Sequence, residues 1–157
     1  MTTISNRTFD EITIGERCER TRTVNGQDLI LFAAVSGDLN PVHLDAEYAA
    51  TTPFKGQIAH GMFTGALVSA ALAMNLPGPG TVYLGQTLSF RRPVKVGDTL
   101  TVILEVTDKH ERKNIVTLAC TVTNQDGKVV ANGEATVMAP AEKLTIKVPD
   151  IPEIHVG

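Results

Sequence analysis

Residues 35–43 read Val-Ser-Gly-Asp-Leu-Asn-Pro-Val-His, and residues 58–76 read Ile-Ala-His-Gly-Met-Phe-Thr-Gly-Ala-Leu-Val-Ser-Ala-Ala-Leu-Ala-Met-Asn-Leu. The first stretch sets Asp38 and His43 five positions apart, around an Asn-Pro break. The second stretch contains no Asp, Glu, Lys or Arg. Together the two stretches predict a polar pair at the mouth of a buried helix.

The second stretch predicts one helix over residues 61–75 that is apolar on all sides. Such a helix is either enclosed by protein or spans a membrane, which needs a run of ~20 apolar residues. The run is rich in Ala, Gly and Ser, and the Pro-Gly-Pro-Gly sequence at 77–80 ends it without a basic flank. These features favour a helix buried in protein, so we expect a sheet that encloses it.

Beyond residue 80 the apolar residues recur with period two, which is typical of half-buried strands. We expect strands over residues 82–90, 100–107, 116–122 and 129–137, with an edge strand over residues 17–24. On the first of these strands one face should carry the following residues, with Gln86 in line among them: Val82, Leu84, Leu88 and Phe90. On the last, small residues such as Gly133 should let the helix approach the sheet closely.

Strands that follow one another directly favour an antiparallel sheet. The expected fold is therefore α+β: a curled antiparallel sheet wrapped around one long central helix, which is a hot-dog fold. The open edges of such a sheet invite a second copy of the chain to pair with it.

The segment that carries Asp38 and His43 joins two helical patterns. A helix should begin after Asn25, with Asp28 in its first turn, and end at Gly37. Because Pro41 disfavours the helical region for the residue before it, the segment from Asp38 to His43 should be bent and not helical. A short helix capped by Asp45 should follow, ending at residue 50.

Length and composition set the remaining limits. The chain of 157 residues suggests one domain over residues 1–140, with an irregular N-terminal segment at 1–15 and an extended tail at 141–157 that could link to a further domain. The net charge of −3 gives no reason to expect a nucleic-acid partner. Cys18 and Cys120 lie far apart and are expected to be reduced thiols, and no metal site is expected. Without an apolar signal region at residues 1–7, we expect a cytoplasmic protein with no membrane partner.

Four motifs carry a resemblance to a known family. They are residues 37–43 (Gly-Asp-Leu-Asn-Pro-Val-His), 59–62 (Ala-His-Gly-Met), 83–90 (Tyr-Leu-Gly-Gln-Thr-Leu-Ser-Phe) and 93–98 (Pro-Val-Lys-Val-Gly-Asp). Over about residues 11–138 the chain resembles the MaoC-type dehydratases, and more narrowly the (R)-specific enoyl-CoA hydratases. The resemblance implies a hot-dog fold, a homodimer and reversible hydration of trans-2-enoyl-CoA to (R)-3-hydroxyacyl-CoA, with the CoA thioester as substrate and no cofactor. The tail also resembles the junction found where such a domain is fused to a phosphate acetyltransferase.

The chemistry of hydration fits the motif residues. Adding water to an enoyl thioester needs a base for the water, an acid for the α carbon and a donor for the thioester oxygen. We assign Asp38 as the water-activating base and His43 as the group that orients the water and shuttles its proton. The two roles could be exchanged, because the groups act as a coupled pair. The alternative is that Asp38 is a turn residue and His43 an exposed loop residue.

The oxygen donor need not be a side chain, because the first amides of a helix have no internal partners and carry its positive dipole end. Gly61 at the helix start would let a thioester approach a bare N–H, unless the glycine merely packs the helix against the sheet. By resemblance, Ser69 matches a serine that supports the catalytic pair, although a helix serine can also bond its own backbone. Asn40 could brace the turn or form an Asx-turn.

Further polar residues have weaker assignments. Gln86 is expected to satisfy nearby backbone, and His60 to shape the helix start without a catalytic role. Two basic groups could meet the CoA phosphates or form a solvated face: Arg91, Arg92 and Lys95, or Arg112 and Lys113.

Three rival functions stay open. The first is a hot-dog acyl-CoA thioesterase, which usually relies on a carboxylate on the central helix, and residues 61–76 contain none. The second is an acyl-carrier-protein dehydratase, distinguished by its substrate carrier. The third is a non-catalytic acyl-CoA-binding module, against which the intact Asp38 and His43 argue.

Overall fold

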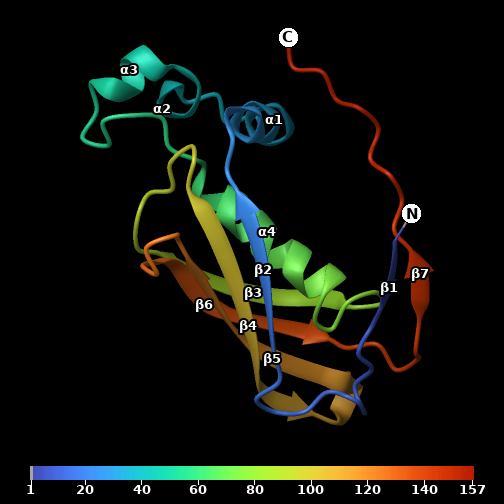
Figure 1. Cartoon of the computed structure of the whole chain (residues 1–157). Helices are drawn as coiled ribbons and strands as arrows, with labels where there is room; N and C mark the ends of the chain where they lie inside the picture. Colours follow the sequence, from blue (N-terminus) through green and yellow to red (C-terminus); the bar gives the residue numbers. More distant parts are fainter. Residues whose placement is uncertain (1) are drawn as a thin grey trace.

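The computed structural model describes residues 2–157 and is built on one curled antiparallel sheet (Figure 1). Its five strands lie in the order β2-β4-β5-β6-β3. Their bounds are β2 Arg17–Thr23, β3 Val82–Phe90, β4 Thr99–His110, β5 Ile115–Thr123 and β6 Val129–Met138, with a short 3₁₀ turn, η1 Arg112–Asn114, between β4 and β5. Burial alternates along β4 and β5 as the period-two pattern predicts. The strands β2 and β3 form the two open edges.

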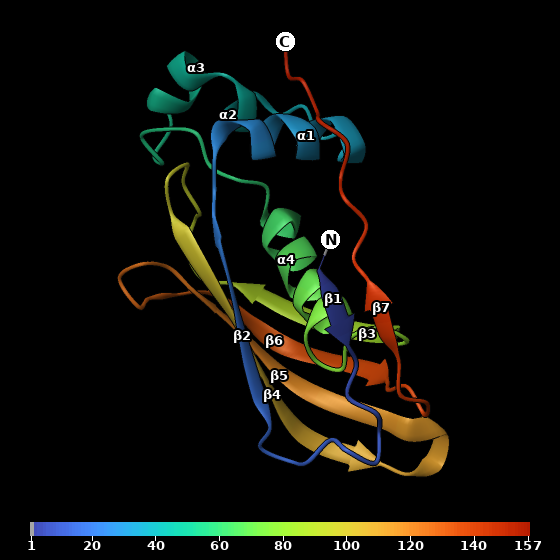
Figure 2. The same cartoon turned by 45° about the vertical axis from the view of Figure 1, so that its right-hand side comes forward.

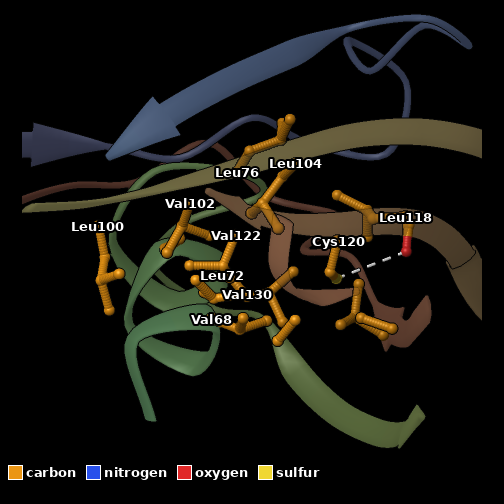
Figure 3. Packing of buried hydrophobic residues seen from close by; sticks show 14 of the residues in the cluster. Val68, Leu72, Leu76, Leu100, Val102, Leu104, Leu118, Cys120, Val122 and Val130 are labelled. Atoms are coloured by element: carbon orange, nitrogen blue, oxygen red, sulfur yellow. Dashed lines mark hydrogen bonds between the residues drawn. The ribbon is translucent and has the colours of Figure 1, made fainter. Parts of the chain in front are cut away.

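The long helix α4, Gly61–Met74, lies on the concave face of the sheet (Figures 1 and 2). Its bounds confirm the predicted helix to within one residue. Val68 and Leu72 are buried between the helix and the strands, where they pack with Val102 and Val122 (Figure 3). Complete burial of one such side chain stabilises the fold by about 1.5–3 kcal/mol. Among residues 2–157, no helix is long and apolar enough to cross a membrane.

The prediction that α4 is enclosed on all sides is wrong for the single chain. Met62 is 60% exposed, and Ala66 and Ala73 are also exposed. The physical reason is that one curled sheet covers only the side of the helix that faces it. The outward side therefore keeps an apolar surface that the sheet of its own chain does not cover.

Three short helices lie together beside the N-terminal end of α4 (Figures 1 and 2). They are α1 Gly26–Ser36, α2 Pro41–Leu44 and α3 Ala46–Ala50. As predicted, α1 begins after Asn25 and ends at Gly37, which lies in the left-handed region at φ 79°. Asn25 and Asp28 also form a reciprocal capping box at its start, which goes beyond the predicted cap. The prediction that the segment up to His43 is not helical is wrong, because Pro41 occupies the first position of α2, where its missing N–H costs nothing.

Strand β3 departs from the predicted alternation. Its pairing with β6 shifts register between Tyr83 and Gly85, so Tyr83 lies opposite the buried Val137. Val82 and Leu84, which were expected on the inward face, are exposed. A bulge of this kind places one extra residue in the strand and so exchanges the faces on either side of it.

The small residue Gly133 on β6 serves a different contact from the predicted one. A Cβ at this position would lie 1.8 Å from the backbone oxygen of Thr87 on β3. The close neighbour is therefore the adjacent strand and not the helix. Only glycine lets the two backbones approach in this way.

The two ends of the chain pair with each other. Strand β1, Thr3–Ser5, lies in the segment predicted to be irregular and pairs antiparallel with β7, Thr145–Lys147, in the tail (Figure 2). The buried amide of Asn6 donates to the carbonyl oxygens of Pro79 and Glu142, at 3.0 and 2.9 Å, and fastens this small sheet to the domain. Residues 149–157 form neither helix nor strand. The division of the chain at residue 140 stays a prediction.

Candidate active site

Asp38 and His43 meet beside the N-terminal end of α4. The shortest distance between them is 3.7 Å, from Asp38 Oδ2 to His43 Nε2. Asp38 follows the cap of α1, and its Oδ1 accepts a hydrogen bond from the Asn40 amide at 3.1 Å. The side-chain oxygen of Asn40 in turn accepts from the amide of Val42 at 3.1 Å, which is an Asx-turn, one of the two alternatives for this residue. These two hydrogen bonds within the turn therefore hold the Asp38 carboxylate close to the His43 imidazole.

The hydrogen bonds of His43 define which ring nitrogen faces the carboxylate. Nδ1 lies 2.7 Å from the carbonyl oxygen of Ile58, which can only accept, so Nδ1 carries the proton and donates. In the neutral ring Nε2 is then an acceptor directed at Asp38. The His43 side chain is 10% exposed and that of Asp38 is 51% exposed, so the pair joins a buried imidazole to a solvent-accessible carboxylate. A water molecule could bond both groups at ordinary hydrogen-bond distances.

His60 contacts both members of this pair. Its ring stacks on that of His43, with 3.7 Å between centroids and 24° between planes. Its Nε2 donates to the carbonyl oxygen of Asp38 at 3.0 Å. The ring is buried, Phe32 lies against it at 5.0 Å between centroids, and its Nδ1 has no partner among the described residues. Sequence reasoning assigned His60 only to the helix start and missed these contacts.

The same three side chains could offer ligand atoms to a metal ion, since one atom from each of Asp38, His43 and His60 lies within 4.8 Å of the others. The ring geometry fits such an ion poorly. Lone pairs of imidazole nitrogens lie in the ring plane, and two nearly parallel stacked rings do not direct them at one point. In addition, one nitrogen of each ring is already used in a hydrogen bond. Nδ1 of His43 donates to the carbonyl oxygen of Ile58, and Nε2 of His60 donates to that of Asp38. The expectation of no bound metal stays a prediction.

Gly61 begins α4 at the edge of this cluster, and no side chain caps the helix. A Cβ at Gly61 would lie 3.5 Å from the ring of Phe90, which is an ordinary van der Waals contact. Packing alone therefore does not require glycine here. The Phe63 amide already donates to the His60 carbonyl oxygen at 3.0 Å. The oxyanion assignment therefore depends on the amide of Gly61 itself, which begins the first turn and has no partner within the helix.

An apolar cavity of about 420 Å³ lies between α4 and β3. Both Ser69 and Gln86 line it, together with Phe32 and Tyr83. Gln86 donates to the carbonyl oxygen of Thr87 at 2.8 Å and accepts from the Tyr83 hydroxyl. Ser69 lines this cavity and not the Asp38–His43 pair, so its supporting role stays a prediction.

The fold and the site together define a hot-dog protein with a carboxylate–imidazole pair beside the start of its central helix. The chain belongs to the MaoC-like family, whose domain model, described as MaoC like domain, matches residues 11–128. The motifs that carried the resemblance lie within that match.

Individual relatives are similar over most of the chain. The (R)-specific enoyl-CoA hydratase of Rhodospirillum rubrum is 46% identical over 133 residues, which are 85% of this chain and 92% of the relative. The 3-hydroxybutyryl-CoA dehydratase of Methylorubrum extorquens is 42% identical over 86% of this chain and 85% of its own. The unliganded R-hydratase PhaJ1 from Pseudomonas aeruginosa superimposes with a TM-score of 0.97 and 56% identity, over 99% of this chain and 100% of that one.

Proposed function

We propose that this chain is an enzyme that adds water reversibly to trans-2-enoyl-CoA and gives (R)-3-hydroxyacyl-CoA. The observation that carries the proposal is the 3.7 Å approach of Asp38 to His43 beside the uncapped start of α4. The relatives named hydratase and dehydratase support it, since the two names describe one equilibrium in opposite directions.

The mechanism assigns one step to each group. Asp38 takes a proton from water while the water oxygen bonds to C3 of the enoyl group. The electron pair of the double bond moves onto the thioester oxygen, where the Gly61 amide stabilises the enolate. His43 orients the water, and the proton taken up by Asp38 moves to Nε2 of His43 and from there to C2, as the enolate collapses to the thioester. The net change is addition of H and OH, in which nothing is oxidised or reduced, so we propose no cofactor.

The cavity lined by Ser69 and Gln86 fits the acyl chain of this substrate. It begins beside Met62, one residue from the proposed oxyanion donor, and its lining is largely apolar. An acyl chain bound there would extend between α4 and β3, with its thioester at Gly61. The mechanism requires the pair Asp38 and His43 to face C2 and C3 of a substrate bound in this way.

We also propose a homodimer in which two sheets join edge to edge. The open edge β3 exposes Val82, Tyr83 and Leu84, and the uncovered side of α4 exposes Met62 next to it. Together these apolar groups are suited to contact with a second copy. Light scattering at micromolar concentration should give twice the chain mass, and a stable monomer would contradict the dimer. A cytoplasmic location and fusion to a phosphate acetyltransferase stay predictions.

The decisive experiment is turnover of crotonyl-CoA. We expect loss of the enoyl-thioester absorbance and a product of (R) configuration at C3. Release of free CoA and free acid would instead establish a thioesterase, and binding without turnover a non-catalytic module. A large preference for crotonyl-acyl-carrier protein over crotonyl-CoA would establish the carrier-protein dehydratase.

A further inference from the structure

A second cavity opens on the other side of the start of α4. Its volume is about 240 Å³, and it is separate from the cavity that fits the acyl chain. Gly61 lines it together with an apolar floor that includes Phe90 and Val94. Two neighbouring cationic residues, Arg91 and Arg92, also line it. One cavity therefore contains both the proposed oxyanion donor and a pair of guanidinium groups.

Neither guanidinium is paired with an acid among residues 2–157. Arg91 Nε donates to the amide oxygen of Asn132 at 3.0 Å, and Arg92 Nη1 donates to the carbonyl oxygen of Val129 at 3.3 Å. Within residues 2–157 neither forms a salt bridge, and both side chains are exposed. A guanidinium has five N–H groups, so these neutral contacts leave donors available to an anion. Arginine is well suited to phosphate, which it can bind in a bidentate manner.

The substrate has one apolar end and one strongly anionic end, joined at the thioester. With the thioester oxygen at Gly61, the acyl chain and the pantetheine must leave in different directions. The cavity lined by Ser69 has no charged residue in its lining. The cavity lined by Phe90 has both Gly61 and the two arginines in its lining. The charge distribution therefore assigns the acyl chain to the first cavity and the CoA portion to the second.

We propose that Arg91 and Arg92 bind the phosphate groups of CoA at the second cavity, and that the pantetheine arm lies along its apolar floor. This proposal rests on the proposed function for its choice of anion. The other basic group, Arg112 and Lys113, lines a different cavity of about 340 Å³ that includes no residue of the candidate active site. That group can therefore serve as a matched control.

The test compares two substrates with the same reacting group. Crotonyl-CoA carries the phosphates, whereas crotonyl-pantetheine lacks them. For Arg91→Ala/Arg92→Ala we expect the KM for crotonyl-CoA to rise about tenfold or more, because charge-assisted hydrogen bonds to phosphate are lost. The kcat should stay within about twofold, and both constants for crotonyl-pantetheine should be unchanged. The control variant Arg112→Ala/Lys113→Ala should match the unaltered protein on both substrates.

Several outcomes would overturn the proposal. They are an unchanged KM for crotonyl-CoA, an equal loss on both substrates, and a loss confined to crotonyl-acyl-carrier protein. Calorimetric titration with CoA itself separates this proposal from the proposed function, because binding needs no turnover. A protein that binds CoA through the arginines but does not hydrate crotonyl-CoA would contradict only the function. A protein that hydrates it with unchanged CoA affinity in the double arginine variant would contradict only this inference.

Discussion

Replacement of His60 by Phe tests whether this buried ring positions the catalytic pair. The phenyl ring can keep the stack on His43, but it removes the donor to the carbonyl oxygen of Asp38. His43 retains a second restraint, its 2.7 Å hydrogen bond to Ile58. The backbone of Asp38 should therefore be the part that loses its position. The matched variant His60→Gln removes the ring and keeps an amide donor near the place of Nε2.

The size of the effect follows from the single bond that is lost. A neutral hydrogen bond contributes about 0.5–1.5 kcal/mol net, which corresponds to roughly two- to tenfold in a rate or equilibrium constant. We expect His60→Phe to lower kcat on crotonyl-CoA by about three- to tenfold with little change in KM. His60→Gln should stay within about twofold of the unaltered protein.

A double-mutant cycle separates positioning from general destabilisation. In an Asp38→Asn background, which lacks the base, His60→Phe should cause little further loss of kcat. An equal factor in both backgrounds would refute the reasoning, and so would a Gln variant as impaired as the Phe variant. A merely structural role would lower the melting temperature in every variant while leaving kcat per folded molecule unchanged.

Further expectations concern the pair itself, acid stability and thiol reactivity. Asp38→Asn and His43→Gln should each lower kcat by at least about a hundredfold with KM little changed. The double variant should be hardly worse than the worse of the two single variants. If both single variants keep near-full activity but melt at a lower temperature, the two residues are structural. The pKa of Glu11 is lowered from 4.5 to about 2, mainly by a hydrogen bond from the Thr8 amide and then by Lys143. The charged form of Glu11 therefore stabilises the fold above pH 4.5, and this contribution is lost as the pH falls towards 2. Glu11→Gln should therefore melt lower than the unaltered protein at pH 7 and no lower near pH 2, and an equal difference at both values would contradict this linkage. Burial raises the pKa of the Cys18 thiol to about 11. Iodoacetamide should therefore alkylate this thiol slowly at pH 8 and faster as the pH rises, as followed by mass spectrometry. Rapid alkylation at pH 7 would contradict the burial of the thiol.

The sequence predicted those parts of the fold that local chemistry determines. The ends of α1 follow from Asn25 and Gly37, whose side-chain cap and left-handed conformation act within a few residues. The bounds of α4 follow from a charge-free run between a His-Gly start and a Pro-Gly end. The faces of β3 could not be predicted in the same way, because the bulge after Tyr83 depends on its pairing with a strand about fifty residues later.

The candidate site shows the same division. The approach of Asp38 to His43 is built into one short segment with an Asx-turn at Asn40, so the motif was sufficient to predict it. The hydrogen bond from His60 to Asp38 joins residues 22 positions apart and depends on how the short helices sit on α4. Likewise, the sequence could not show which of the two basic groups is the better candidate for binding the CoA phosphates. That distinction depends on which group lines the same cavity as Gly61.

The pairing of β1 with β7 brings two segments from near the two ends of the chain side by side. The amide of Val148 donates to the carbonyl oxygen of Thr2 at 2.8 Å, so the two strands β1 and β7 bring residues 2 and 148 into contact. A short peptide linker could join these two positions, and the chain could be reopened at the exposed hairpin turn of residues 124–127. In such a permuted chain, α4 and the segment of Asp38 and His43 would come after β6 in the sequence but keep the same neighbours in space.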